Sequence, residues 1–329
     1  MNISFKRFIL KMLLFLLFIF LGQAIIVQPN SENTSFPEKD LLDKYFDQKT
    51  EIIYFGDSSV YYSWEEDNDK RSIPDRLREL INNHSVGEIY YPAFSTEIYQ
   101  AFCEYIIKKG MHPLMIIIPI NLRSFSAGWD LKPDYQFKKE KYFLKHGNPI
   151  STIFYQPLTI FRFFQPDISS AQYDQTLVYD GDRAVGTIKE YDYPNYYTAW
   201  SEKCLKNIMV FQYMNSIPEN HRKIKAMMAT ARILKENHIK VLFYITPIDY
   251  QTGVKYLGNH FMDRVSANET SIKSLLVKEG IEPLDLLFAL PTEDFYWDQG
   301  KIPCEHLYPM GKQYVAQQLA NRMKGDLPP

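Results

Sequence analysis

From Glu51 onward the chain alternates short apolar runs with longer segments in which apolar residues recur at helical spacing. The short runs have the length of buried strands, and the longer segments have the period of amphipathic helices. This alternation is typical of βαβ units, in which helices cover both faces of a parallel sheet. The sequence therefore predicts an α/β fold, a three-layer sandwich with a central parallel sheet.

Five runs are the expected strands, the last of them weaker than the others. They are EIIYF (51–55), EIYY (88–91), LMIIIPI (114–120), KVLFYIT (240–246) and IEPLDLL (281–287). The clearest helix is predicted over 219–238. Its apolar residues follow the helical period, namely Ile224, Met227, Met228, Ala231 and Leu234.

The alternation weakens between Asn121 and Pro218, where Tyr, Phe and Pro are abundant, as in YQPLTIFRFFQPD and KEYDYPNYYTAW. We interpret 122–217 as an aromatic-rich insertion in the α/β core. Aromatic side chains with polar tips suit a sugar-binding cleft or a bilayer surface, but cores and loop anchors use them as well. The pattern leaves these roles open.

The N-terminus has the pattern of an export or anchoring signal. Three basic residues, Lys6, Arg7 and Lys11, precede a stretch without any charge from Met12 to Val27. Basic residues stay on the cytoplasmic side of such a segment, so the rest of the chain is expected on the extracytoplasmic face of the membrane.

These features divide the chain into three parts. The sequence predicts a transmembrane signal-anchor over 1–28, a polar linker over 29–49 and the main domain over 50–329. The alternative is cleavage after Ala24, because small residues stand where a signal peptidase cuts. Cleavage would release the domain instead of tethering it.

Composition and charge exclude several functions. The chain has 37 Lys plus Arg and 39 Asp plus Glu, a net charge of -2, which gives no reason to expect a nucleic acid as partner. The three cysteines are far apart and form no CxxC motif, so they are expected as small buried hydrophobic residues. The histidines form no HxH or HExxH pair, and neither a metal nor another cofactor is expected.

A serine follows the first predicted strand. The segment YFGDSSVYY puts Ser58 at the carboxyl end of this strand, where open α/β sheets place their active sites. The tight turn at Gly56 would expose the hydroxyl, and N–H groups at the start of the next helix would face a developing oxyanion. Ser58 is therefore the candidate nucleophile.

A histidine near the C-terminus is the candidate base. His306 stands in EHLYPMG, just before the helical pattern KQYVAQQLANRMK. A serine hydroxyl is a weak nucleophile until a base takes its proton, and a histidine on a late loop can reach a serine after the first strand. We therefore expect His306 on a loop beside Ser58.

The serine block and the histidine block, in this order and over this length, resemble the SGNH/GDSL hydrolases. The resemblance implies a flavodoxin-like sheet, with Ser58 as nucleophile and His306 as base. It also implies an oxyanion hole, for which Asn121 follows the central strand in LMIIIPINLRSFS. The family's second block normally offers a glycine; YYPAFSTEIYQAF has Ala93 and Ser95 there, and the backbone N–H of Ser95 is expected to serve instead.

The catalytic acid departs from the family pattern. Most relatives carry it three residues before the histidine, where this chain has Pro303. Asp298 is the expected acid if QGKIPCE is a local insertion, and Glu305, adjacent to His306, is the alternative. A carboxylate in this role holds the useful tautomer of the imidazole.

The anchor, the outward domain and the DSS block are also similar to proteins that move acyl groups outside the membrane. These include the D-alanyl-transfer protein of teichoic acid modification and the O-acetylation proteins of alginate and peptidoglycan. This resemblance implies an O-acyl transferase or esterase that acts on a cell-envelope polysaccharide or another acyl ester through a Ser58 acyl-enzyme. It also implies a membrane-bound O-acyltransferase as partner.

Two other functions stay open at this point. Because the acid is missing from its usual place, the chain is alternatively an inactive SGNH-like module that serves as scaffold for an acyltransferase. A secreted lipase or general esterase is the third hypothesis, which retention of the N-terminal segment would disfavour. If the enzyme is active, its activity should fall below about pH 6.5, where an ordinary histidine becomes protonated.

Overall fold

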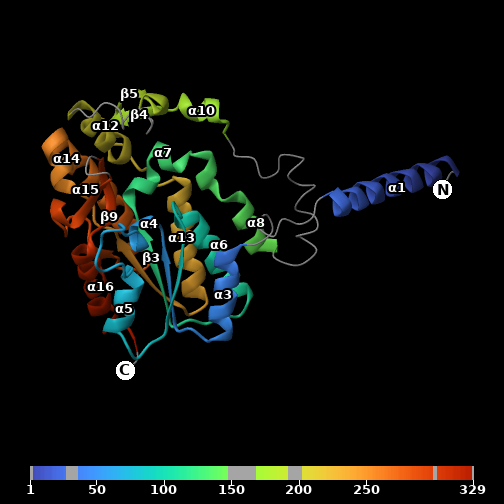
Figure 1. The fold of residues 1–329 in the computed structure, drawn as a ribbon, viewed down its shortest axis with the longest axis horizontal. Helices are drawn as coiled ribbons and strands as arrows, with labels where there is room; N and C mark the ends of the chain where they lie inside the picture. The colour runs from blue at the N-terminus through green and yellow to red at the C-terminus, as the bar shows by residue number, and fades with distance from the viewer. Residues whose placement is uncertain (1–2, 27–35, 147–167, 192–201, 299–301, 328–329) are drawn as a thin grey trace. The chain divides into compact units, whose positions relative to one another are not determined.

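Five parallel strands form the central sheet of the chain's main body (Figure 1). The computed structural model describes residues 3–26, 36–146, 168–191, 202–298 and 302–327. The strands are β1 (Ile52–Gly56), β2 (Val86–Tyr90), β3 (Met115–Ile120), β6 (Lys240–Ile245) and β7 (Leu284–Asp285). Each overlaps one predicted run, so the predicted parallel sheet is confirmed.

The strand order places a crevice beside the end of β1. The order is β2-β1-β3-β6-β7, with Ile52 paired to Val86 on one side and to Met115 on the other. The chain leaves β1 for one edge and then crosses back to β3, which makes the β1/β3 boundary the topological switch point of a flavodoxin-like sheet. Ligands of such sheets bind outside the carboxyl ends of the strands at this point.

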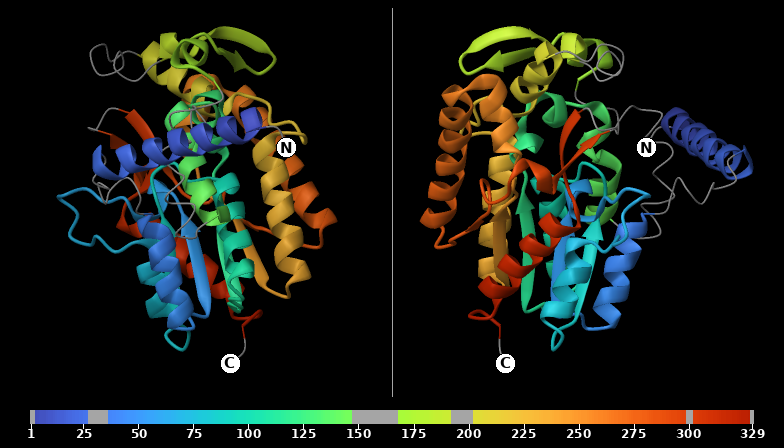
Figure 2. Two further views of the ribbon diagram at one scale, coloured as in Figure 1. Left: turned by 90° about the vertical axis from the view of Figure 1, so that its right-hand side faces the viewer. Right: turned by 60° about the vertical axis from the view of Figure 1, so that its left-hand side comes forward.

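Helices cover both faces of the sheet (Figure 2). On one face α5 (Ile73–Leu80) packs against α16 (Pro309–Met323), and both bury apolar side chains against Ile52 and Tyr54. On the other face Phe55 stacks on Phe102 of α6 (Thr96–Lys108). There α13 (Arg222–Glu236) packs between α6 and α15 (Asn259–Lys278). The three-layer arrangement follows from strands that are apolar on both sides.

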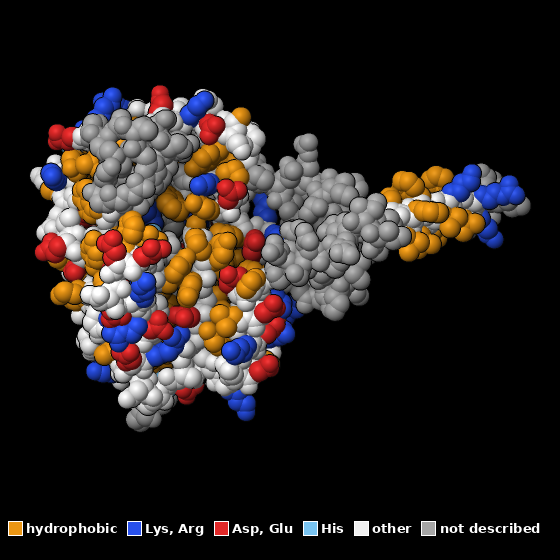
Figure 3. All heavy atoms as spheres, viewed as in Figure 1, with side chains coloured by type: hydrophobic (Ala, Val, Ile, Leu, Met, Phe, Trp, Pro, Cys, Tyr) orange, Lys and Arg blue, Asp and Glu red, His pale blue; other side chains and the backbone are white. Residues whose placement is uncertain are grey.

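The described part of the predicted insertion consists of short elements that lie beyond the carboxyl ends of the strands, apart from α8, which packs on α6 (Figures 1 and 2). They are η1 (Leu122–Phe125), α7 (Ala127–Asp130), η2 (Pro133–Gln136), α8 (Lys138–His146), α10 (Ser170–Asp174), β4 (Leu177–Asp180), β5 (Arg183–Thr187), η3 (Ile188–Tyr191) and α12 (Glu202–Tyr213). Hydrophobic side chains gather in the middle of the face of the main body that Figure 3 shows, with both signs of charge mixed around them.

The remaining elements lie at the edges of this core or between its strands. They are α3 (Pro37–Asp47), α4 (Ser58–Tyr61), α14 (Tyr250–Leu257), η4 (Thr292–Asp294), β8 (Phe295–Asp298) and β9 (Ile302–Leu307). The last two form an antiparallel hairpin that leads directly into α16.

The N-terminal segment forms the helix α1 (Ile3–Ile26). It belongs to a separate unit, Met1–Pro37, from the body that runs from Glu38 to Pro329. Within the part of the chain that the structure describes, no helix meets the length and hydropathy that a membrane crossing requires. The signal-anchor over 1–28 stays a prediction.

Candidate active site

The turn after β1 presents Ser58 and holds Ser59. Asp57 is the N-cap of α4, and its Oδ1 accepts hydrogen bonds from the Ser59 backbone N–H at 2.8 Å and the Ser59 hydroxyl at 2.6 Å. Gly56 is required by the close approach of this helix, because a Cβ there would lie 2.7 Å from Cγ2 of Val60. The Ser59 hydroxyl is thus committed to the turn, whereas the Ser58 hydroxyl faces outward.

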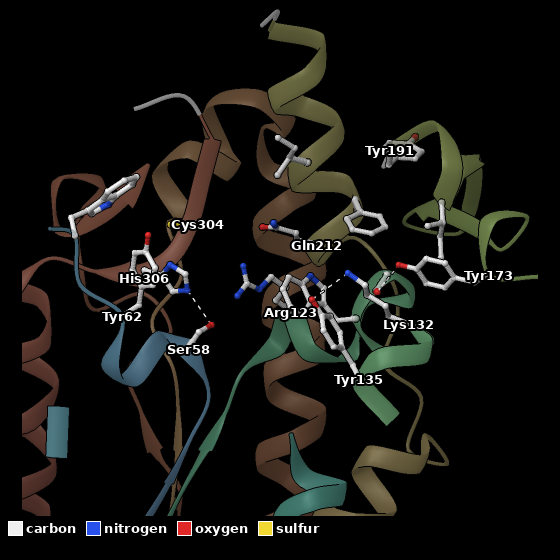
Figure 4. Close-up of a pocket in the computed structure, with 16 residues that line it drawn as sticks. Ser58, Tyr62, Arg123, Lys132, Tyr135, Tyr173, Tyr191, Gln212, Cys304 and His306 are labelled. Atoms are coloured by element: carbon white, nitrogen blue, oxygen red, sulfur yellow. Dashed lines mark hydrogen bonds between the residues drawn. The ribbon is translucent and has the colours of Figure 1, made fainter. Parts of the chain in front are cut away.

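His306 meets Ser58 from the other end of the chain (Figure 4). Its Nε2 lies 3.0 Å from the Ser58 Oγ, within hydrogen-bond distance of a base and its nucleophile. The expectation of a loop was wrong, because His306 lies on β9 of the β8–β9 hairpin. Pairing with β8 fixes the backbone of the candidate base more firmly than a loop would.

A buried lysine supports the imidazole indirectly. The ring of Tyr62 stacks on His306 with centroids 4.1 Å apart. Lys312 of α16 is fully buried, and its Nζ donates to the backbone oxygen of Tyr62 and to the Ser63 hydroxyl. The lysine therefore anchors the turn that holds Tyr62 against His306.

His306 is neutral over a wide pH range. Burial, together with the positive charges of Arg123 and Lys312, lowers the pKa of His306 to about 3. A neutral imidazole has a free nitrogen lone pair, which is the form that accepts a proton from a hydroxyl. The protonated form, by contrast, is disfavoured here.

Asn121 lies at the switch point beside the serine. It follows β3, and its Nδ2 donates to the Asp57 Oδ2 at 3.1 Å, while its Oδ1 accepts from the Arg123 backbone N–H at 3.0 Å. Asn121 and Ser58 also share a small hollow. Burial raises the pKa of the Glu305 carboxyl, and the Asn121 side chain, which also acts as a hydrogen-bond donor towards Glu305, opposes that rise. Asn121 therefore lies beside Ser58 with its amide shared among Asp57, Glu305 and the hollow, and its role as an oxyanion donor stays a prediction.

The structure does not place Ser95 in this hollow. Ser95 is the buried N-cap of α6, whereas Ala93 and Phe94 line the hollow together with Ser58. Ala93 has a φ of 63°, in the left-handed region that favours glycine. Ala93 and Phe94 thus lie nearer the hollow than Ser95, because the chain turns at Ala93 before the helix begins, and the Ser95 N–H as an oxyanion donor stays a prediction.

Neither candidate acid is seen to contact the histidine. Adjacent residues of a strand point to opposite faces, and Glu305 accordingly turns away from His306 to accept a hydrogen bond from Tyr213. Its Oε2 lies 3.1 Å from the Arg123 Nε. The side chain of Asp298 lies outside the described residues, although its backbone pairs with Ile302 in the hairpin that carries His306. Asp298 thus stays a prediction as the acid.

A cavity of about 380 Å³ opens in front of Ser58 and His306. Much of its wall comes from aromatic residues of the insertion. Trp129 stacks on Tyr135 with centroids 5.1 Å apart, and Tyr173 donates to the Gly128 backbone oxygen at 2.8 Å. Lining a cavity is thus one role of this segment, among those that its composition left open.

Sequence reasoning missed three further polar residues of this cavity. They are Arg123, Lys132 and Gln212. The one usable signal was the position of Arg123 two residues after Asn121, at the carboxyl end of β3. Lys132 and Gln212 reach the cavity from the insertion, where no periodic pattern shows which side chains face inward.

The cysteines show no arrangement for catalysis or metal binding among the described residues. All three are buried. Cys304 lines the cavity and donates to the Tyr296 backbone oxygen at 3.0 Å. The described ranges contain no group of three His, Cys, Asp or Glu that could hold a metal ion.

Comparison with known proteins gives weak structural similarities at low identity. No protein-family model matches this chain, and no curated protein matches it. Est24, a carbohydrate acetylesterase from Sinorhizobium meliloti, is 8% identical with a TM-score of 0.36, covering 84% of this chain and 100% of Est24. A proposed acylhydrolase from Bacteroides fragilis is 10% identical with a TM-score of 0.35, covering 86% of this chain and 96% of that one. Similarities this weak say nothing about the activity of this chain.

The low pKa of His306 predicts an unusual pH profile. If the neutral imidazole is the base, kcat/KM should persist well below pH 6.5 and fall only as the pH approaches the His306 pKa of about 3. Between about pH 6.5 and 3, His306 binds a proton in the unfolded chain but not in the folded one. The free energy of unfolding therefore decreases as the pH falls through this range. Ester hydrolysis measured with circular dichroism as a folding control checks this. An acidic limb centred near the ordinary value of about 6.5 would contradict it.

Proposed function

We propose that this chain is a serine-dependent acyl hydrolase or O-acyl transferase. The observation that carries the proposal is the hydrogen bond of 3.0 Å between the His306 Nε2 and the Ser58 Oγ, two residues that line a cavity beside the switch point. The two residues are separated by 248 positions in the chain, so no local turn explains their contact. A nucleophile and a base in this geometry suit acyl transfer.

The proposed chemistry begins with attack of the Ser58 Oγ on the carbonyl carbon of an ester. His306 takes the hydroxyl proton, Asn121 stabilises the oxyanion, and the alkoxide leaves with the proton that His306 returns. The acyl group, now esterified to Ser58, then passes to water in a hydrolase or to a second hydroxyl in a transferase. In either case His306 removes the proton of the acceptor.

A cell-envelope polymer is the proposed substrate, and a membrane-bound O-acyltransferase the proposed partner. The aromatic wall of the cavity supports a saccharide, because Trp and Tyr faces pack against the apolar faces of sugar rings. The basic N-terminal segment supports an extracytoplasmic location, where such polymers lie.

An inactive scaffold is the second candidate function. It is favoured by His306, because no described carboxylate contacts its Nδ1 and because its pKa is lowered to about 3. In a triad the acid fixes the tautomer and stabilises the imidazolium. If nothing supplies that stabilisation, proton transfer from Ser58 is unfavourable.

Neighbouring serines offer a matched test of catalysis. Ser58→Ala should lower esterase activity by ~10³-fold or more. It should also abolish labelling by a fluorophosphonate probe. Ser59→Ala should retain labelling and most activity, because its hydroxyl is held by Asp57 in the turn. Circular dichroism would confirm that both variants fold. If labelling were lost only in Ser59→Ala, the assignment of Ser58 as nucleophile would be wrong. A wild-type protein that the probe does not label would favour the inactive-scaffold function.

The location can be tested by fractionation. An anchored chain should sediment with membranes, resist carbonate extraction and retain Met12 to Val27 in its peptide map. A mature chain that begins at Ile25 would contradict the anchor, since the segment would then have been removed.

A further inference from the structure

The cavity contains a buried guanidinium without a protein partner for its terminal nitrogens. The side chain of Arg123 is only 8% exposed, and its Nε lies 3.1 Å from the Glu305 Oε2. Its plane lies over the Trp129 ring at 4.3 Å, and neither Nη has a hydrogen-bond partner among the described residues. Figure 4 shows these nitrogens pointing into the cavity on the side of Ser58 and His306.

A second buried polar group faces the same space. Gln212 of α12 is 6% exposed, and Figure 4 shows its amide directed into the cavity above Arg123. The described residues offer this amide no hydrogen bond. The terminal nitrogens of Arg123 and the amide of Gln212 face the cavity and not other described protein groups, so a ligand in the cavity can complete their hydrogen bonds.

The charges around the cavity have one sign. Lys132 lies on its far side, with its Nζ 3.3 Å from the Tyr135 hydroxyl and 4.6 Å from the centre of that ring. No described carboxylate lies within ion-pair distance of Lys132, and no Asp or Glu is among the described residues that line the cavity. Glu305 is paired with Arg123 and does not line the cavity, so the positive charge of Lys132 has no described negative charge opposite it.

We propose that this cavity binds an anionic group of the substrate, a carboxylate or a phosphate, through Arg123 and Gln212, with Lys132 as a second cation. The inference rests on the proposed function and narrows its substrate to acyl esters that carry negative charge. The fork of a guanidinium matches two oxygens of a carboxylate or phosphate, and such charge-assisted hydrogen bonds are strong in a site shielded from water.

The bound anion also acts on the base. Arg123 contributes to the low pKa of His306, so a negative charge on Arg123 would raise the His306 pKa towards its ordinary value. The substrate then stabilises the imidazolium, a role that an acid plays in a triad. Positioning and activation would both depend on the same contact.

Matched esters test the proposal. The probes are neutral phenyl acetate, 3-acetoxybenzoate and 3-acetoxyphenyl phosphate, and the two anionic esters distinguish carboxylate from phosphate. We expect kcat/KM to be higher for at least one anionic ester by about 10-fold or more, as charged hydrogen bonds imply. The acidic limb of its kcat profile should lie at higher pH than that of phenyl acetate, since this limb reports the bound complex.

Variants assign the effect to residues. Arg123→Lys keeps a positive charge beside Glu305. Gln212→Leu and Lys132→Gln break no ion pair among the described residues. Each of the three variants should lower the ratio of kcat/KM for the anionic ester to kcat/KM for the neutral ester. Lys255→Gln is the control, because Lys255 also lies over a tyrosine ring, 5.2 Å from that of Tyr256, but outside the cavity. A wild-type ratio near one, or a ratio that all variants share with the wild type, would overturn the proposal.

A binding measurement separates this inference from the proposed function. Ser58→Ala protein, which cannot turn over, is titrated with benzoate, phenyl phosphate and neutral benzyl alcohol in a calorimeter. Binding of an anion that Arg123→Lys weakens supports the subsite even if no ester is hydrolysed. Absence of anion binding overturns the subsite, whereas a wild type that a fluorophosphonate does not label overturns only the acyl-enzyme.

Discussion

The carboxylate of Asp57 organises the site at the switch point. One oxygen holds the backbone and hydroxyl of Ser59, and the other accepts a hydrogen bond from Asn121 across the ends of β1 and β3. This arrangement leaves the Ser58 hydroxyl directed outward and brings the amide of Asn121 beside it. It is possible because β1 and β3 are neighbours in the sheet although α5, β2 and α6 separate them in sequence.

The elements that place Ser58 and Asn121 were predictable because each is specified locally. A strand buried on both faces is a continuous apolar run, so β1, β3 and β6 are visible in the sequence. The turn that Asp57 caps comes directly after the first strand in the sequence, so it could be located as well. Helix α13 is equally visible, since one of its faces is apolar throughout.

The remainder depends on contacts between distant segments. Because β9 is a strand paired with β8, His306 and Glu305 face opposite sides of the hairpin. Neither strand has the alternation of apolar and polar residues that would have predicted this. The left-handed turn at Ala93 lacks the glycine that would have marked it. The partner of Arg123 lies 182 positions away, from 123 to 305, so its burial and its free nitrogens belong to the fold alone.

The account rests on Ser58 as the residue that carries the acyl group. Brief incubation of the full chain with p-nitrophenyl acetate, an acid quench and peptide mass spectrometry test this directly. The account predicts one acetyl group on the peptide that contains Ser58, assigned by fragmentation to Ser58 itself and absent from Ser58→Ala. An acetyl group on Ser59 or Cys304, or a protein that hydrolyses the ester without ever carrying one, would contradict it.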